Sequence, residues 1–350
     1  MESIELLKTL SNAFGVSGRE EPVKKTIQEI VEPLVDEIRT DSLGNFIATK
    51  HGQGKKSLML DAHMDEIGFM INYIDDDGYL GFVPLGSWDQ RILPSHRMEV
   101  LCEDETTVTG VIGTVPPHIQ DEEDRKSVID MEDLFLDVGA NSRGEVKELG
   151  IKVGSFATIH YPFRQLNDNY VLGKAFDDRA GCAAVIKVLE ELKDHKLGAT
   201  LVANFAICEE TGLRGARTAA YQINPDVALA LEGTIGADIP GVEEKRQPVT
   251  LGKGPAITLA DKSIVVKKNL TDALVNLAQE KGISYQFKRP AFGGTDAGAI
   301  HLSREGVIAG VLSVPCRYIH SPNSTLRLDD FRETVSLTAE FVKEFPGTVK

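Results

Sequence analysis

The sequence lacks both the paired cysteines of a disulfide framework and the long apolar runs of a membrane protein. Its 350 residues include four cysteines, which are widely scattered and form no CxxC pair. This pattern is typical of reduced thiols in a cytosolic protein. No apolar run approaches the ~18 residues of a membrane span. Glu2 and Glu5 lie where a signal peptide would be positively charged. We therefore expect a cytoplasmic protein with no membrane partner.

An excess of positive charge is also missing. Lysine and arginine total 38 against 53 aspartates and glutamates, which gives a net charge of −15. This charge would repel nucleic acid and anionic membranes at long range, which argues against both as partners. Hydrophobic residues make up 42% of the chain, enough for a full core. The length favours two domains over one, since a domain usually has roughly 100–200 residues.

The pattern of the chain changes twice. Residues 1–40 predict two helices separated by a turn at residues 15–18, and short strands follow. After residue 68, short β-like runs alternate with turns, and helical periodicity is nearly absent. That periodicity returns near residue 177. We therefore expect a main domain formed by residues 1–68 and 161–350, interrupted by a small β-rich domain at residues 69–160.

In the second part of the main domain, strands alternate with helices. This alternation indicates an α/β fold with a mixed, largely parallel sheet and helices on both faces. In such sheets the chemistry collects at the carboxyl ends of the strands. The periodicity predicts helices around Cys182–Leu189, Leu270–Ala278 and Phe331–Phe345, and strands at Thr200–Ile207, Val227–Leu231, Ile283–Phe287 and Val307–Val314.

Two motifs with acidic residues adjoin these elements. His63 and Asp65 follow an apolar strand, and alternate residues of extended backbone point to the same side. Asp65 can therefore fix the ring of a metal-bound His63, although a strand-end histidine with satisfied hydrogen bonds also explains the pattern. Asp177 and Asp178 open the helix at Cys182. Either aspartate could cap that helix or bridge two cations.

Three further acids and a histidine follow apolar strands. Glu209 and Glu210 come directly after the strand ending at Ile207, and solvated acids in a first helical turn are one explanation. The strand before them is apolar enough to be buried, however, and paired acids at its end need compensation, which metal cations would supply. Glu232 ends a second apolar strand, and His320 follows a third. Neither identifies a site on its own.

Charge balance favours one site built from these residues. Two divalent cations carry +4, three carboxylates (Asp177, Glu210 and Glu232) carry −3, and a bridging hydroxide carries −1. Two neutral histidines complete a neutral set that a buried site tolerates better than bare carboxylates. The ligands are oxygen and imidazole nitrogen, so zinc, cobalt or manganese fits better than a metal that prefers thiolates.

The order of these motifs resembles the tetrahedral (TET) dinuclear metallo-aminopeptidases, a family that includes glutamyl and deblocking aminopeptidases. The resemblance extends from residue 61 to residue 322, nearly the whole chain. EExGLRGA together with GGTDAG is its specific part. The matching segments are DAHMDEIGFM, GKAFDDRAGC, EETGLRGA, ALEGT, GGTDAGAIH and CRYIHSP.

The resemblance implies a role for each matching residue. The metal ligands would be His63, Asp177, Glu210, Glu232 and His320, with Asp177 bridging two metal ions. Glu209 would be the general base, and Asp65 would orient His63. One departure is Glu232, because many relatives have aspartate there.

The resemblance also implies the reaction and the assembly. A hydroxide that bridges the two metals would attack the peptide carbonyl, and Glu209 would take the proton of the water and pass it to the leaving amine. The substrates would be short peptides that lose their N-terminal residue. Residues 69–160 would form a β-barrel-like domain used in oligomer assembly, and the family typically forms hollow homo-dodecamers.

Other hypotheses use the same residues. A two-metal amidohydrolase that removes an acyl group from a small metabolite shares the chemistry and differs in the pocket. A glycan hydrolase would need opposed carboxylates ~5–9 Å apart, which adjacent Glu209 and Glu210 supply poorly. A non-catalytic metal-binding assembly protein would have no use for Glu209. The sequence leaves open which first residue the substrate has. Arg214, Arg317 and Lys262 are basic residues that could favour an acidic one.

Overall fold

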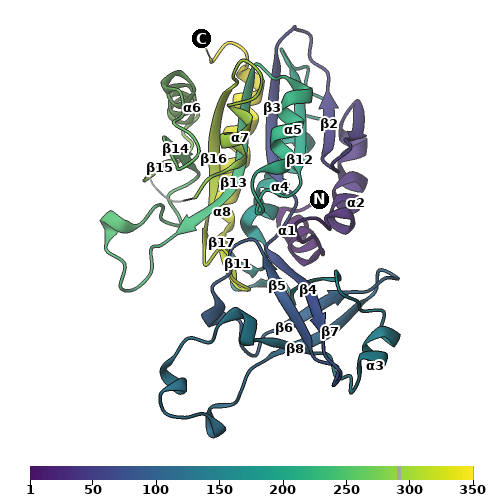
Figure 1. Cartoon of the computed structure of the whole chain (residues 1–350). Coiled ribbons are helices and arrows are strands. Elements are labelled where there is room, and N and C mark those ends of the chain that lie inside the picture. Colours follow the sequence, from purple (N-terminus) through teal and green to yellow (C-terminus); the bar gives the residue numbers. More distant parts are fainter. Residues whose placement is uncertain (290–292, 350) are drawn as a thin grey trace.

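The computed structural model describes residues 1–289 and 293–349, which form a layered α/β domain with a β-barrel beneath it (Figure 1). Within these residues one sheet contains 11 strands. Four parallel strands form its centre: β12 (Thr200–Ala206), β3 (Ser57–His63), β13 (Val227–Gly236) and β16 (Ile308–Arg317). Parallel strands place their carboxyl ends at one edge of the sheet, and the barrel lies at that edge.

Antiparallel strands complete the sheet on both sides, so the sheet is mixed, as the sequence predicts. On one side β2 pairs with β12 and β1 pairs with β2. On the other side β16 is followed in the sheet by β17, β11 and β10, while β14 and β15 extend from β16. These strands are β1 (Glu37–Thr40), β2 (Phe46–Lys50), β10 (Arg164–Gln165), β11 (Tyr170–Gly173), β14 (Ala256–Thr258), β15 (Gln286–Lys288) and β17 (Ser324–Arg327).

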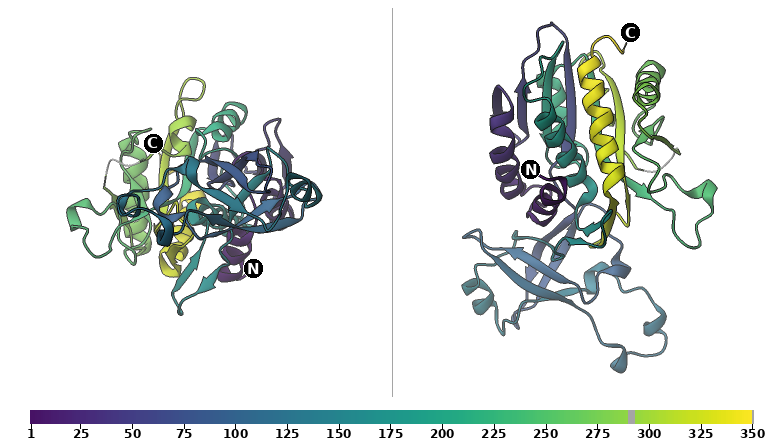
Figure 2. Two further views of the ribbon diagram at one scale, coloured as in Figure 1. Left: turned by 60° about the horizontal axis from the view of Figure 1, so that its bottom comes forward. Right: turned by 180° about the vertical axis from the view of Figure 1, so that it is seen from behind.

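Helices cover both faces of the sheet. On one face lie α1 (Ser3–Asn12), α4 (Phe176–Glu191) and α8 (Leu328–Glu344), and on the other lie α5 (Arg214–Ile223) and α7 (Asp296–Ile300), as Figures 1 and 2 show. Helix α4 is apolar nearly all round and packs between the sheet and its two neighbours, so it is buried along most of its length. The remaining helices of this domain, near the sheet edges, are α2 (Glu21–Val31) and α6 (Lys268–Lys281).

The barrel has six strands and a hydrophobic core of its own. All its strand pairs are antiparallel, and closure removes the open edges that would otherwise pair with other chains. This confirms the predicted barrel-like domain, whose strands lie between Gly68 and Ile159. Around the barrel the strands are β4 (Gly68–Ile74), β5 (Leu80–Leu85), β8 (Phe135–Asp137), β7 (Thr107–Gly113), β6 (Arg97–Leu101) and β9 (Phe156–Ile159), and the helix α3 (Arg143–Glu148) lies beside them.

A buried ionic cluster joins the two domains. Glu66 accepts hydrogen bonds from Lys174 at 2.6 and 2.7 Å and from Thr158 of the barrel at 3.0 Å. The guanidinium of Arg179, which is fully buried, lies 3.5 Å from Glu66 and donates to the carbonyl oxygen of Met64 at 2.6 Å. Buried charges are tolerated when they are paired and hydrogen-bonded in this way. The cluster therefore holds the barrel, the end of β3 and the start of α4 in fixed relative positions.

Three predicted strand boundaries are wrong: the strand predicted at Ile283–Phe287 is β15 at Gln286–Lys288, the strand predicted to end at Val314 continues to Arg317, and the strand of Glu232 is longer than predicted. The apolar run that ends at Leu231 predicts that Glu232 ends its strand, yet β13 continues to Gly236. The extension arises because β16 pairs with β13 over ten residues, from Val227 opposite Ile308 to Gly236 opposite Arg317. Glu232 therefore lies inside a strand that pairs with β16 before and after it, and its backbone is more rigid than that of a residue in a loop.

Candidate active site

The predicted site residues lie together at the edge of the sheet that faces the barrel. They come from segments far apart in the sequence and meet because β3, β12, β13 and β16 run in the same direction. His63 ends β3, Asp177 lies at the start of α4, Glu209 and Glu210 lie in the turn after β12, Glu232 lies within β13, and His320 follows β16.

Asp65 holds the turn that bears the two glutamates. Its carboxylate accepts hydrogen bonds from the backbone N–H of Glu209 at 3.0 Å and of Glu210 at 3.2 Å, and from the Ser17 hydroxyl at 2.5 Å. Burial alone would raise the pKa of Asp65, but the hydrogen bonds and the nearby His63 ring outweigh it and hold the pKa below its usual value. Asp65 is therefore a charged anchor beneath the turn.

His63 is oriented by the backbone of Asp65. Its Nδ1 lies 3.0 Å from the Asp65 carbonyl oxygen and 3.4 Å from the Asp65 carboxylate. Because a carbonyl oxygen only accepts, Nδ1 carries a proton, and Nε2 is the ring nitrogen that could bind a metal ion in place of its own proton. That nitrogen lies 3.4 Å from Asp177 and 3.7 Å from Glu232. An imidazole held this way is prepared to bind a metal ion.

His320 is oriented in the same manner by a different partner. Its Nδ1 lies 3.1 Å from the carbonyl oxygen of Ser87, in the segment that follows β5 of the barrel. Its Nε2 lies 3.3 Å from Glu210 and 3.4 Å from Oδ2 of Asp177. The other oxygen of Asp177, Oδ1, is the one that faces His63. One carboxylate thus lies between two imidazoles, the arrangement expected of a bridging ligand.

Asp178 is held by backbone groups, although one of its oxygens lies within 4.8 Å of ligand atoms of His63 and Glu232. Its carboxylate accepts hydrogen bonds from the backbone N–H groups of His63 at 3.1 Å and of Gly181 and Gly233 at 2.9 Å each. A Cβ at Gly233 would lie 2.9 Å from the Phe176 carbonyl oxygen, so only glycine allows the start of α4 to approach β13 this closely. Asp178 therefore fastens α4 to β3 and β13, with a helix-capping contact to Gly181 as one part of that role.

The crowding of carboxylates fits a pair of bound cations. In the chain alone, burial raises the pKa of Glu232 to about 8 and the pKa of Glu209 well above its ordinary value, with neighbouring carboxylates adding to both shifts. Burial would lower the pKa of His320, but hydrogen bonds to Asp177 and Glu210 raise it to about 11. Such shifts mean that positive charge, from protons or cations, is needed here.

The donor set supports a metal rather than protons alone. Ligand atoms of His63, Asp177 and Glu210 lie within 4.8 Å of one another, and so do those of His63, Asp178 and Glu232. Imidazole nitrogen and carboxylate oxygen are the ligands of zinc, cobalt and manganese sites.

Two buried aspartates behind the site were missed by sequence reasoning. Asp296, at the start of α7, is fully buried, and its carboxylate oxygens have no hydrogen-bond partner among the described residues. Its backbone N–H donates to Glu232 at 3.3 Å and so positions that ligand. Asp61 accepts from Asn204 at 2.6 Å, and burial raises its pKa to about 6. Both residues stand in the quoted motifs, but nothing in their spacing distinguishes buried from exposed acids.

The site opens into a cavity of about 340 Å³, which is large enough for a small ligand. Its lining includes Asp177, Glu209, Glu210, Glu232 and His320. The site is therefore accessible from outside the protein.

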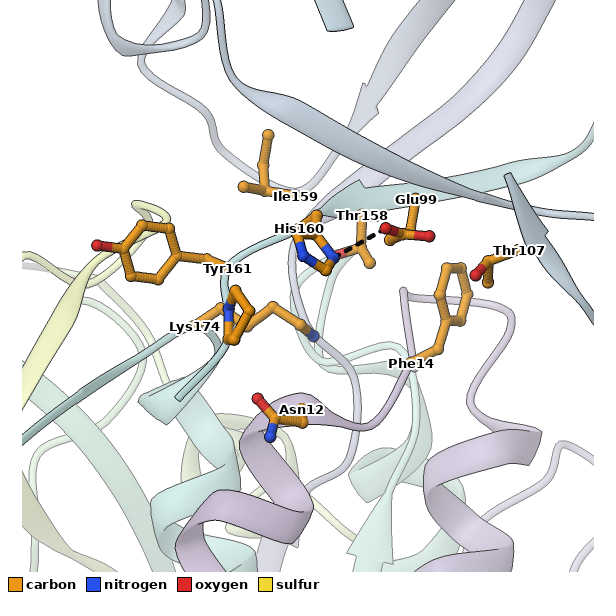
Figure 3. A pocket seen from close by; sticks show the side chains of 10 residues that line it. Asn12, Phe14, Glu99, Thr107, Thr158, Ile159, His160, Tyr161 and Lys174 are labelled. Carbon is orange, nitrogen blue, oxygen red and sulfur yellow. Dashed lines mark ion pairs between the residues drawn. The ribbon is translucent and has the colours of Figure 1, made fainter. Parts of the chain in front are cut away.

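A second cavity, of about 330 Å³, lies between α1 and the barrel, and Figure 3 shows it from close by. His160 and Glu99 form an ion pair of 2.8 Å at this cavity, above Lys174 and Asn12. The Lys174 ammonium group is already bound by Glu66. This second cavity therefore marks the domain junction, and the metal-ligating groups gather at the first.

Comparison with known proteins agrees with this chemistry. The model of the M42 glutamyl aminopeptidase family matches residues 44–337. The lysyl aminopeptidase of Pyrococcus furiosus is 35% identical over 97% of this chain and 96% of its own length. The TET aminopeptidase of a marine-sediment Thaumarchaeota archaeon is 36% identical with a TM-score of 0.96, over 99% of this chain and 98% of that one. The chain of PhTET1, solved as a dodecamer, is 35% identical to this chain with a TM-score of 0.89, and the match covers 99% of this chain and 100% of that one.

Fold, donor set and relatives together define a metallo-aminopeptidase. More particularly, the chain belongs to the M42 glutamyl aminopeptidase family, as the quoted motifs predict. No helix in the described part of the chain is long and apolar enough to cross a membrane. The cytoplasmic location stays a prediction.

Proposed function

We propose that the chain removes the N-terminal residue from short peptides, with Glu209 as the general base beside two divalent cations. The observation that carries this proposal is the position of Glu209. Asp65 holds its backbone, while its side chain lies in the cavity with His63 at 3.8 Å. Within the described part of the chain, no group donates a hydrogen bond to the Glu209 carboxylate, so it is available to accept a proton.

The proposed ligands divide between two cations. His63 and Glu232 would hold one ion, Glu210 and His320 the other, and Asp177 would contact both. Bound there, zinc, cobalt or manganese would polarise the peptide carbonyl and lower the pKa of a water molecule. The longer side chain of Glu232, where many relatives have aspartate, is fixed by the Asp296 N–H, which supports its use as a ligand.

The residues of the chain then account for the proton movements. Glu209 would accept the proton of the attacking water and donate it to the leaving amine, which needs a carboxylate within reach of both groups. Asp65 would hold the backbone of Glu209 and Glu210 in place, so that the general base lies beside the metal ligands. Glu210 is turned towards His320, whereas Glu209 is nearest to His63, which argues against the two acting as the opposed pair of a glycan hydrolase.

A metal-reconstituted assay tests the reaction. Exhaustively metal-free protein should be inactive on Leu-, Glu- and Lys-p-nitroanilide, and Co²⁺ or Zn²⁺ should restore cleavage. N-acetylated forms of the same substrates should stay uncleaved, because an acetylated nitrogen has no basic lone pair with which to bind a cation in the site. Full activity of metal-free protein would end the two-metal proposal, and preferred cleavage of N-acetyl amino acids would favour the amidohydrolase.

We further propose that residues 69–160 assemble the chain into a homo-dodecamer with its active sites inside. The relative PhTET1 forms a dodecamer, and the barrel of this chain exposes apolar side chains around the segment 114–133. Val115, Ile119 and Val128 are 52%, 75% and 53% exposed. Apolar groups exposed to this extent are typical of surfaces that contact another subunit.

Light scattering tests the assembly. The native protein should have the mass of a dodecamer and should trim short peptides while leaving folded proteins intact. Ile119→Asp should give smaller species, since a buried charge disfavours the contact. Ile119→Leu keeps the apolar surface and should preserve the mass. A monomeric native protein with full peptidase activity would show that assembly is not needed.

A further inference from the structure

We propose that a groove along α5 binds the part of a peptide substrate that follows the cleaved bond, and that two arginines in it favour peptides with an acidic residue several positions after the first. This inference rests on the proposed function, because it requires the peptide to be bound with its amine at the metal site. Three observations support it: the groove adjoins the active-site cavity, it lies on the side of the leaving peptide, and the charged groups in its lining are all positive.

The groove has a volume of about 710 Å³, which is within the range of ligand cavities. Its walls are the outer face of α5, the residues after α7 and the segment between β1 and β2. Helices α5 and α7 pack together on one face of the sheet (Figure 1). Large hydrophobic side chains remain exposed in the groove: Tyr221 by 59%, Leu302 by 74% and Leu43 by 51%. A patch of such side chains is typical of a binding surface.

The groove continues the active-site cavity, because Gly212 and Leu213 line both. These two residues belong to the turn that begins with the proposed general base. The backbone N–H groups of Gly212 and Leu213 each donate to the carbonyl oxygen of Glu209 at 2.8 Å. Helix α5 starts directly after this turn, at Arg214. A peptide that leaves the cavity past Glu209 therefore enters the groove.

The direction of the groove suits the leaving peptide. In the proposed mechanism Glu209 donates a proton to the leaving amine, so the residue after the cleaved bond lies beside Glu209. Leu213 is followed at intervals of four residues by Arg217 and Tyr221, which also line the groove, and this interval places side chains on one face of a helix. Eight residues of helix rise about 12 Å. An extended peptide covers that length with about four residues.

The charged side chains of the groove are both basic. Arg217 and Arg304 line it, and the described part of the lining has no aspartate or glutamate, although the whole chain carries a charge of −15. Across residues 1–289 and 293–349 no carboxylate lies within 4.0 Å of either guanidinium group. An acidic side chain of a bound peptide would therefore meet two guanidinium groups that have no ionic partner in the chain.

Contacts to Tyr221 already hold Arg304 in place. The Nε of Arg304 donates to the carbonyl oxygen of Tyr221 at 2.7 Å, and its Cζ lies 4.3 Å from the centroid of the Tyr221 ring. An arginine fixed in this way loses little freedom when its remaining N–H groups bind a carboxylate. Beside it, Ser303 is 8% exposed, and its hydroxyl has no hydrogen-bond partner among the described residues. The groove thus offers a further donor to a bound peptide.

Peptides of one length test the groove in the metal-loaded enzyme. Leu-Ala-Ala-Glu-Ala-Ala-Ala-amide and its Gln counterpart have the same shape and differ in charge. The Glu peptide should release leucine with a kcat/KM about fivefold higher, since exposed ion pairs are individually weak. The gain should come from a lower KM, because the contact is far from the reacting bond. High salt should remove it by screening the charges.

Two further peptides locate the carboxylate. Moving the glutamate to the second position, in Leu-Glu-Ala-Ala-Ala-Ala-Ala-amide, should abolish the gain, because that residue lies beside Glu209 and not in the groove. The Gln peptide with a free C-terminus should be cleaved like its amide, which separates an acidic side chain from the C-terminal carboxylate as the group that is bound.

Substitutions of the two arginines complete the test. Arg217→Gln and Arg304→Gln together should raise KM for the Glu peptide until its kcat/KM equals that of the Gln peptide, with kcat unchanged. Cleavage of Leu-p-nitroanilide should stay within twofold of wild type, because that substrate ends before the groove. Arg164→Gln is the matched control. Arg164 is exposed, lies in β10 at the other end of the sheet, and has no carboxylate within 4.0 Å among the described residues.

Four outcomes would overturn the inference. The first is wild-type enzyme that cleaves the Gln and Glu peptides equally well, a comparison that needs no variant. The second is a gain from a free C-terminus as large as that from the glutamate. The third is an equal loss on Leu-p-nitroanilide in the double variant, which would indicate a structural role. The fourth is a smaller mass of the double variant in light scattering, which would make the groove a contact between copies of the chain.

Failure of the proposed function looks different. Metal-loaded wild type would then cleave neither the peptides nor Leu-p-nitroanilide. Cleavage of all of them without a preference for the Glu peptide would remove the role of the groove and leave the aminopeptidase reaction in place.

Discussion

Glu209→Gln should reduce kcat by about a thousandfold, the usual contribution of a general base. Glutamine has the shape of glutamate but cannot accept the proton of the attacking water. The backbone N–H of residue 209 would still donate to Asp65, so the turn and its neighbour Glu210 should keep their positions. Steady-state kinetics on an aminoacyl p-nitroanilide, with elemental analysis of bound metal, measures both parts of this prediction.

The metal content separates a lost base from a lost ligand. The Glu209→Gln protein should retain both metals per subunit and should bind a competitive inhibitor as tightly as the wild type. Activity within tenfold of the wild type in a metal-replete sample would remove Glu209 from the mechanism. Loss of metal from this variant would instead reassign Glu209 as a ligand.

Asp177→Ala should lose both metals, because the two oxygens of Asp177 face different histidines, His63 and His320. Calorimetric titration with Zn²⁺ should show weakened binding at both sites, and activity should fall with it. Burial would raise the pKa of Asp177, but hydrogen bonds from His320 and His63 outweigh it and hold the pKa below its usual value. The metal-free variant should therefore unfold at a somewhat lower temperature than metal-free wild type. The midpoint of thermal unfolding in chelator measures this.

Asp178 offers the matched control, because it adjoins Asp177 but holds backbone groups. Asp178→Ala would leave three buried N–H groups without their acceptor, which should cost at least about 2 kcal/mol of stability. Its metal-free form should therefore unfold at a lower temperature than metal-free wild type. The opposite result would assign the bridging role to Asp178. In that case Asp178→Ala protein would be stable but would bind no metal, and Asp177→Ala protein would keep both metals.

Much of the fold and of the site follows from local patterns in the chain. An apolar run followed directly by an acid or a histidine marks the carboxyl end of a buried strand, and this pattern places His63 and the Glu209–Glu210 pair correctly. The same logic fails for Glu232, whose strand is lengthened by its long pairing with β16. Short elements such as α7 and β14 also escape sequence reasoning, because their few residues show no periodicity.

The sequence by itself determined the α/β class, the β-rich insert and the residue types of the site. These properties depend on composition and on spacing along the chain. Only the tertiary structure decided which groups orient the site: the Ser87 carbonyl on His320 and the Asp65 carboxylate under Glu209. Those contacts join residues from different domains and strands, and their geometry exists only once the sheet has brought distant segments together.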